Sequence, residues 1–273
     1  MEIGAYIRTW RESTIKQVFE KMSSQGIYIG QYNMSCVGEA TLPSSINREK
    51  INMVRQSSAD YNIHLFGLSG TFNIIYACER DFDHFLYLLE IAQELSIPYI
   101  TICTGTYCKK SMWLPDIKNQ SSEAWSCMLR AIERLLLLAE SAGIIIGIEP
   151  EPSNIVSNAF TAKRLLEHFN TEFLKIVMDG ANLLSNTTRE KQPIILTEAF
   201  RLLSPDIICV HCKDFDSNGK FVAAGKGNMD YPLYLKLLKG TNYKGPLLLH
   251  QLSPEEVPGS VDFIRKVEQL IAR

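Results

Sequence analysis

The sequence predicts a single (β/α)₈ barrel, because short apolar runs alternate with amphipathic helical segments along all 273 residues. The strand-like runs are rich in Ile, Val, Leu and Tyr and mostly apolar throughout, as expected for strands covered on both faces. They number eight and span residues 2–7, 27–35, 62–69, 98–104, 144–149, 174–179, 207–212 and 246–251. A barrel of about 250 residues commonly forms one domain, so we expect one domain over residues 1–273.

The segments between these runs carry the spacing of apolar residues that is typical of helices packed on a sheet. The i, i+3, i+4, i+7 pattern is clearest in Ile15, Val18, Phe19 and Met22. The longest helix is expected over residues 121–142, with Leu129 on its buried stripe. Near the end, residues 253–256 (Ser-Pro-Glu-Glu) have the pattern of a capping box. We expect Pro258 and Gly259 to interrupt that turn before the last helix.

A doubly wound open sheet is the other architecture that alternates strands and helices. An open sheet that binds nucleotides carries a glycine-rich turn after its first strand, but residues 8–12 here are Arg-Thr-Trp-Arg-Glu. The number of strand–helix units and the chain length favour the closed barrel.

Composition excludes several classes of function. The 28 basic and 30 acidic residues are interspersed and give a net charge of −2, so neither a nucleic acid nor a membrane surface is an expected partner. The N-terminus lacks the pattern of a secretory signal, and the seven cysteines are odd in number, so a cytoplasmic protein with free thiols is expected. Cys209 and Cys212 lie three apart on a strand and should face opposite sides, which argues against a redox pair.

Four metal-competent side chains stand where the last four strands end: Glu149, Asp179, His211 and His250. Functional residues of barrels collect at this end of the strands, and a buried carboxylate has to be paired, protonated or bound to a cation. A hydrogen-bonded polar residue is the simpler interpretation for any single one, but four in register favour a metal site. The mixed nitrogen and oxygen set suits one divalent ion, which we expect to be Mn²⁺, Fe²⁺, Co²⁺, Zn²⁺ or Mg²⁺.

Five further residues near these strand ends are candidates for contact with a substrate: Glu151, Asn182, Lys213, Tyr107 and Trp113. If Glu149 points inward, alternation along the strand places Glu151 at the rim. Support of the metal ligands is the alternative role for Glu151 and for Asn182. Lys213 lies two residues after His211 and should therefore point to the same face of the strand. We expect it to bind a substrate oxyanion or to hold Asp214, with a surface ion pair as the alternative. The aromatic residues, Trp10 among them, are candidates to stack on the apolar face of a sugar.

Residues 224–230 (Ala-Gly-Lys-Gly-Asn-Met-Asp) precede the seventh helix of the repeat and allow two interpretations. Barrels often bind phosphate in this position, through backbone N–H groups at a helix entry. The alternative is a turn in which Asp230 caps the following helix.

Four segments carry a resemblance to a known family: "GIEPEPSNIV", "VMDGANLL", "VHCKD" and "YKGPLLLHQLSPEEVPGSVDFI". They resemble the sugar phosphate isomerase/epimerase group, which has a xylose-isomerase-like TIM barrel. The segments "IGAYIR", "GLSGTFN" and "ICTGTY" of the first half also fit, so the resemblance covers essentially the whole chain, and its specific part is the second half.

The resemblance implies a metal held by Glu149, Asp179 and His211, with His250 standing where the family has a glutamate. In the epimerase members, the two glutamates are bases on opposite faces of the sugar. The resemblance therefore implies an isomerase or epimerase that acts through an enediolate, with Glu149 and His250 as catalytic residues. A metal-bound imidazole is a poor proton carrier, so the histidine disfavours two-base epimerisation relative to an aldose–ketose isomerisation that uses Glu149 alone.

The expected substrate is a small sugar, sugar phosphate or keto-polyol. Two alternatives on the same site are a keto-polyol dehydratase and a sugar-binding barrel that lost catalysis. An apurinic endonuclease shares this barrel but needs three zinc ions and many histidines, whereas this chain has five histidines and no basic groove is expected. The sequence leaves open the particular sugar, the metal and whether the chain forms a homo-oligomer.

Overall fold

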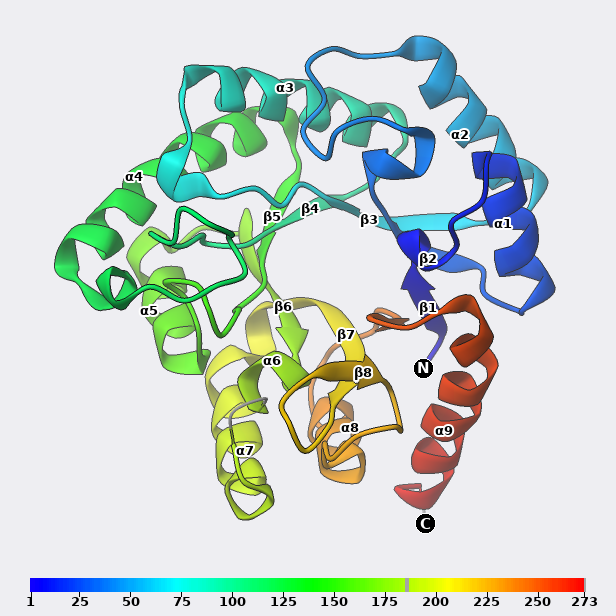
Figure 1. Ribbon diagram of the computed structural model, residues 1–273, viewed down its shortest axis with the longest axis vertical. Helices are drawn as coiled ribbons and strands as arrows, with labels where there is room; N and C mark the ends of the chain where they lie inside the picture. Colours follow the sequence, from blue (N-terminus) through cyan, green and yellow to red (C-terminus); the bar gives the residue numbers. More distant parts are fainter. Residues whose placement is uncertain (185–186, 273) are drawn as a thin grey trace.

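The computed structural model describes residues 1–184 and 187–272, and its strands form a closed barrel (Figure 1). All barrel strands are parallel; β9 pairs with both β1 and β7, and β6 pairs with β7, so the ring closes. The barrel strands are β1 (Ile3–Tyr6), β2 (Ile29–Tyr32), β3 (His64–Ser69), β4 (Tyr99–Ile102), β5 (Ile145–Ile148), β6 (Leu174–Asp179), β7 (Ile207–Phe215) and β9 (Leu247–Leu249). The predicted (β/α)₈ barrel is confirmed.

The helices surround this ring of strands (Figure 1). They are α1 (Ile15–Ser24), α2 (Arg48–Asp60), α3 (Glu79–Glu94), α4 (Ser122–Ala142), α5 (Ala159–Phe169), α6 (Gly180–Leu184), α7 (Gln192–Leu203), α8 (Tyr231–Lys239) and α9 (Val257–Leu270). Most follow one strand each, and the short α6 precedes α7 in the connection after β6. The connections at the carboxyl ends of the strands are therefore the place where a site can form.

Local sequence signals explain where these helices begin and end. Thr14 and Gln17 form a capping box at the start of α1, and the predicted apolar stripe of that helix is buried. Ser121 caps α4, and Gly143 ends it with a positive φ of 67°. Leu129 is only partly buried at the edge of the predicted stripe.

The predicted interruption at Pro258 and Gly259 is wrong. The capping box of Ser253 and Glu256 is present, but α9 begins directly at Val257 and continues through both residues. A proline in the first turn of a helix has no intrahelical N–H bond to lose, which explains why the helix tolerates it.

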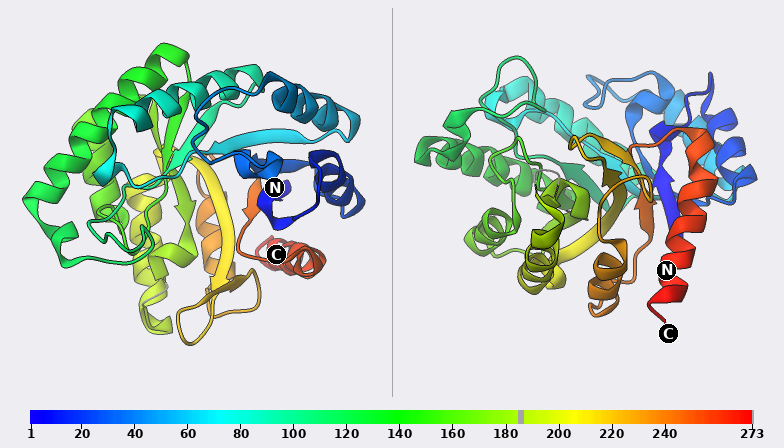
Figure 2. Two further views of the ribbon diagram at one scale, coloured as in Figure 1. Left: turned by 45° about the horizontal axis from the view of Figure 1, so that its top comes forward. Right: turned by 60° about the horizontal axis from the view of Figure 1, so that its bottom comes forward.

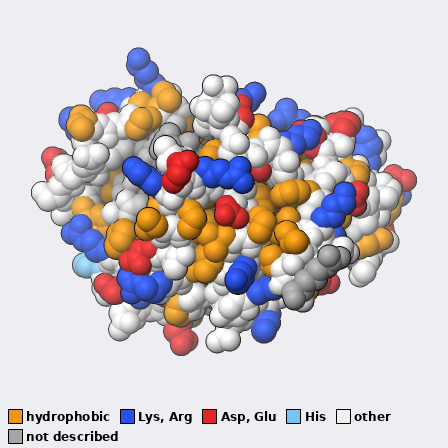
Figure 3. Space-filling model, turned by 90° about the horizontal axis from the view of Figure 1, so that it is seen from below, with side chains coloured by type: hydrophobic (Ala, Val, Ile, Leu, Met, Phe, Trp, Pro, Cys, Tyr) orange, Lys and Arg blue, Asp and Glu red, His pale blue; other side chains and the backbone are white. Residues whose placement is uncertain are grey.

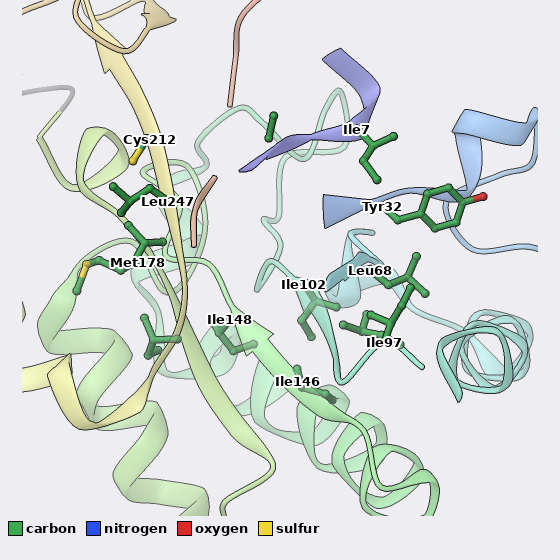
Figure 4. Packing of buried hydrophobic residues seen from close by; sticks show 14 of the residues in the cluster. Ile7, Tyr32, Leu68, Ile97, Ile102, Ile146, Ile148, Met178, Cys212 and Leu247 are labelled. Carbon is green, nitrogen blue, oxygen red and sulfur yellow. The ribbon is translucent and has the colours of Figure 1, made fainter. Parts of the chain in front are cut away.

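Alternation along the strands separates an apolar outer face from the barrel interior. Ile146 and Ile148 of β5 and Cys212 of β7 belong to the main apolar cluster (Figure 4). The smaller cluster inside the barrel includes Tyr99 and Cys209. Cys209 and Cys212 are thus free and lie in different clusters, as strand alternation predicted.

Strand β7 runs three residues beyond its predicted end, to Phe215, and forms an antiparallel hairpin with β8 (Phe221–Ala223). The polar residues Lys213 and Asp214 suggested that the strand stopped. Both are buried, and each has partners inside the protein that permit burial.

The two ends of the chain lie on the same side of the barrel (Figure 2), where the N-terminal ammonium of Met1 lies 2.7 Å from Glu268 of α9. On the face seen in Figure 3, basic and acidic side chains are interspersed. Across the described residues, no helix combines the length and apolarity that crossing a bilayer requires.

Candidate metal centre

The fold brings Glu149, Asp179, His211 and His250 together at the carboxyl ends of the last four barrel strands. Each offers one ligand atom, and these four atoms all lie within 4.8 Å of one another. Asp179 ends β6 and His211 lies within β7, whereas Glu149 and His250 directly follow β5 and β9. The first three are buried and His250 is partly exposed.

A hydrogen-bond chain from the first half of the barrel fixes the ring of His211. Nε2 of Gln31 donates to Oγ1 of Thr101 at 3.1 Å, so Oε1 of Gln31 faces Nε2 of His211 at 2.8 Å. This arrangement places a proton on Nε2 of His211 and directs Nδ1 to Oε1 of Glu149, at 3.2 Å. Nδ1 is therefore the nitrogen that would bind a metal. A hydrogen bond from the other ring nitrogen, here to Gln31, commonly fixes the orientation of a metal-binding histidine.

Two buried atoms of these four side chains have no hydrogen-bond partner among the described residues: Oδ2 of Asp179, which lies 3.1 Å from the ammonium of Lys213, and Nδ1 of His250. Unpaired buried polar atoms are rare in native proteins. Both belong to the four-residue cluster, and a carboxylate oxygen and an imidazole nitrogen are preferred ligands of Zn²⁺ and Mn²⁺. The residues present therefore fit a divalent cation.

Charges inside the centre shift several pKa values. Burial raises the pKa of Asp179, but the charge of Lys213 and then that of His211 outweigh it, so this pKa lies well below its usual range. Burial opposes the charge of His211, yet the carboxylate of Glu149 raises the His211 pKa well above 6.5. Burial and then the charge of His211 lower the pKa of His250. His250 is thus a neutral imidazole at pH 7, the form that binds a metal.

The centre opens into a pocket of about 700 Å³. Glu149, His211 and His250 line it, together with residues from the other half of the barrel. Those additional lining residues include Arg8, Gln31, Asn33, Ser69 and Thr101. This volume is in the range of pockets that hold a small ligand.

The sequence pattern of a known family matches residues 10–267, and its description is a xylose isomerase-like TIM barrel. The chain belongs to the xylose isomerase-like TIM barrel family. No curated protein matches the sequence significantly.

Solved structures share the barrel at low sequence identity. A D-tagatose 3-epimerase-like protein has a TM-score of 0.80 and 16% identity, with 100% of this chain and 98% of that chain covered. D-Psicose 3-epimerase with D-tagatose, from Clostridium cellulolyticum H10, has a TM-score of 0.72 and 16% identity over 98% and 99% of the two chains. The IOLI protein with a bound zinc atom has a TM-score of 0.73 and 15% identity over 99% and 98%. At these identities the likeness is one of fold.

Within this xylose isomerase-like barrel, two of the residues predicted to contact substrate line the pocket without belonging to the four-residue ligand cluster. Glu151 follows β5 and Trp113 lies in the long loop after β4. Burial and then the charge of Glu149 raise the pKa of Glu151 to about 8. Its carboxyl group is therefore protonated at neutral pH.

Lys213 also lines the pocket, but its partner differs from the predicted Asp214. Its Nζ lies 3.1 Å from Oδ2 of Asp179 and 4.0 Å from the centre of the Phe221 ring. The ammonium and this carboxylate form a buried ion pair. Lys213 thus balances one of the two carboxylates of the ligand cluster.

Asn182 holds the ligand carboxylates and is not among the residues that line the pocket. It belongs to α6, which turns back directly after β6. Its backbone N–H donates to Oδ1 of Asp179 at 3.1 Å, and its Nδ2 donates to Oε1 of Glu149 at 3.0 Å. Of the two roles predicted for Asn182, support of the ligands and contact with substrate, the geometry therefore favours support of the ligands.

Two aromatic residues lie away from the pocket, contrary to the prediction. Tyr107 packs edge-on against Tyr76, whose hydroxyl donates to the Tyr107 carbonyl at 2.7 Å. Trp10 is 2% exposed within the core, and its Nε1 donates to Gln25. Their sequence positions in loops do not reveal these partners.

The backbone amides of the glycine-rich segment bind a carboxylate of the protein itself. The N–H groups of Gly225, Gly227 and Met229 donate to the carboxylate of Asp214 at 2.9–3.2 Å. These amides are therefore not free to bind a phosphate, and Asp230 caps α8 by accepting from Leu233. The interpretation as a capped turn is correct. A side chain at Gly227 would collide with Asp214 and Phe215, which explains the glycine there.

Proposed function

We propose that this protein is a divalent-metal-dependent sugar isomerase that moves a proton through an enediolate, with aldose–ketose isomerisation as its reaction. One observation carries the proposal: two buried ligand atoms without a hydrogen-bond partner among the described residues, on Asp179 and His250, meet Glu149 and His211 at the floor of a sugar-sized pocket. Membership in the family and the fold shared with sugar epimerases agree with it.

Glu149, Asp179, His211 and His250 would hold the cation. When bound, the cation supplies a Lewis acid that stabilises negative charge developing on substrate oxygens. The protein supplies the geometry, since Asn182 and Gln31 fix Glu149 and His211 before any ligand arrives.

Glu149 is the proposed general base. Its Oε1 accepts from Asn182 and faces His211, whereas none of the hydrogen bonds among the described residues uses its Oε2. Glu149 lines the pocket, so Oε2 is the oxygen that can remove a proton from the carbon next to a carbonyl. Such proton transfer by a positioned carboxylate accelerates reactions by about 10²–10⁴-fold.

The arrangement of the acids favours isomerisation over epimerisation. Epimerisation needs proton carriers on opposite faces of the sugar, and His250 is a neutral ligand candidate in place of the second glutamate. The other titratable carboxyl group, Glu151, comes from the same loop as Glu149, and atoms of the two lie within 4.8 Å. Both protonatable groups therefore act from one side of the pocket, which suits return of the proton to the same face.

Dehydration of a keto-polyol is the second candidate, because the protonated Glu151 could also give its proton to a departing hydroxyl group. The reaction begins with the same proton removal by Glu149. Loss of water from the product, in contrast with an isomeric product of equal mass, distinguishes the two.

The test is incubation of metal-replete protein with a panel of aldoses and keto-sugars in D₂O, followed by NMR and mass spectrometry. We expect deuterium at the carbon next to the carbonyl together with formation of the isomeric sugar. The Glu149→Gln variant should bind the metal more weakly and exchange the proton about 10²–10⁴-fold more slowly. Binding of sugars without any exchange by the wild type would contradict the proposal and indicate a sugar-binding barrel.

A further inference from the structure

Arg8 is a charged residue that lines the pocket and has no role in the proposed metal site or proton transfer. It lies in the short 3₁₀ helix Ile7–Thr9, directly after β1, and lines the pocket with its exposed side chain. Among the described residues its guanidinium makes neither a hydrogen bond nor an ion pair, whereas Arg55, Arg134 and Arg265 all pair with glutamates.

The backbone around Arg8 is fixed, although the guanidinium itself is free. Ile7 is completely buried, and Trp10 is 2% exposed and hydrogen-bonded to Gln25. These buried neighbours hold the start of the Arg8 side chain at the edge of the pocket. The guanidinium of Arg8 offers five N–H donors from a side chain whose backbone is already held in place. This reduces the conformational entropy lost when a ligand binds.

The charges around the pocket favour a negatively charged ligand. Inside, the carboxylates of Glu149 and Asp179 face the ammonium of Lys213 and the proposed divalent cation. The positive charges of Lys213 and the divalent cation together exceed the two negative charges of the carboxylates, and Arg8 adds a further positive charge. A pocket lined by an excess of one charge attracts ligands of the opposite charge.

The position of Arg8 also gives the ligand a direction. In the ring of strands β1 lies across the barrel from β5, and Glu149 directly follows β5. Trp113 and Pro152, from the loops after β4 and β5, give that side of the pocket apolar surface. A linear sugar can therefore place its carbonyl end at Glu149 and a charged end at Arg8.

We propose that Arg8 binds an anionic group of the substrate, a carboxylate or a phosphate, and that the protein therefore acts on an acidic sugar. This inference rests on the proposed function, because it assigns the substrate class of the same site. A guanidinium binds either anion through two parallel hydrogen bonds, which adds geometric selectivity to the charge.

Isothermal titration calorimetry on manganese-loaded protein tests this inference with two matched pairs of sugars. The pairs are D-fructose with D-fructose 6-phosphate, and D-glucose with D-glucuronate. We expect the wild type to bind the anionic member of at least one pair about tenfold or more tightly, and the preferred pair identifies the anion. Arg8→Gln should abolish that preference, and Arg8→Lys should keep part of it, because an ammonium keeps the charge but lacks the planar fork.

Arg11→Gln is the matched control, because Arg11 is an exposed arginine nearby that does not line the pocket. It should keep the preference of the wild type. An unchanged preference in Arg8→Gln, or equal binding of both members of each pair by the wild type, overturns the inference. Anionic sugars that bind through Arg8 without proton exchange in D₂O would support this inference while contradicting the proposed isomerase.

Discussion

The two halves of the barrel contribute different chemistry to the same pocket. Strands β5 to β9 deliver all four candidate ligands, whereas β2 and β4 contribute the neutral side chains of Gln31 and Thr101. Gln31 reaches across the barrel to His211, 180 positions away in sequence. The second half thus holds the charges of the ligand cluster, and Gln31 of the first half orients one of the ligands, so changes at the ligands and at Gln31 should differ in size and kind.

The largest effect is expected from Glu149 in the ligand half. Glu149→Gln keeps the shape of the side chain and its contact to Asn182 but removes the basic oxygen. We expect proton exchange to fall by about 10²–10⁴-fold, with the thermal unfolding temperature nearly unchanged. An exchange rate within tenfold of the wild type would show that another group is the base.

Asp179→Asn tests the charge balance of the same half. The substitution leaves Lys213, which is 2% exposed, without its negative partner. Breaking a buried ion pair in this way costs about 3–5 kcal/mol, measured as the free energy of unfolding in urea. Asp206→Asn is the control, since its ion pair with Lys175 at 2.8 Å is partly exposed, and it should cost about 1 kcal/mol or less. Equal costs would contradict the account of Lys213.

Gln31→Met tests the orienting half. The variant keeps the length of the side chain but cannot accept a hydrogen bond from His211. We expect metal affinity to fall about 10–100-fold, measured by competition with a chromophoric chelator. Ser69→Ala, a change at another pocket residue of the first half, should leave the affinity within twofold. If Gln31→Met lowered metal affinity as much as replacing His211 does, Gln31 would be as important as a ligand, and the proposed difference between the two halves would be wrong.

The smallest effect concerns pH. The pKa of Glu151 is raised to about 8 by burial and then by the charge of Glu149. The protonated form therefore dominates at pH 7 and is lost as the pH rises through about 8. If Glu151 returns the proton, the rate should fall about tenfold per pH unit above that value, and Glu151→Gln should lower the rate at all pH values. A rate that stays constant to pH 10 would exclude this role.

Much of the fold could be predicted from the sequence because the signals for each strand and helix lie within that segment. The apolar runs, the stripe of α1 and the capping box of Ser253 all depend on neighbouring residues. The end of β7 was missed because Lys213 and Asp214 look like surface residues. Lys213 can be buried because it pairs with Asp179, which is distant in sequence. Asp214 can be buried because it accepts from the amides of residues 225–229, which reach it only after folding.

The candidate ligands were visible for a similar reason. In a barrel every strand ends at the same rim, so position along each strand is sufficient to group Glu149, Asp179, His211 and His250. Gln31 was missed, although a lone amide within an apolar strand was a signal for it. Its partnership with His211 depends on which strands face each other across the barrel, and local pattern does not contain that information.

Anomalous diffraction from manganese-soaked crystals is the most direct test of whether these four residues hold one divalent cation. We expect a single strong anomalous peak in contact with Glu149, Asp179, His211 and His250, at about 2.0–2.3 Å from the ligand atoms. This peak should disappear in Asp179→Asn. No peak at this position in the wild type, or a peak that His250 does not contact, would contradict the proposed metal site.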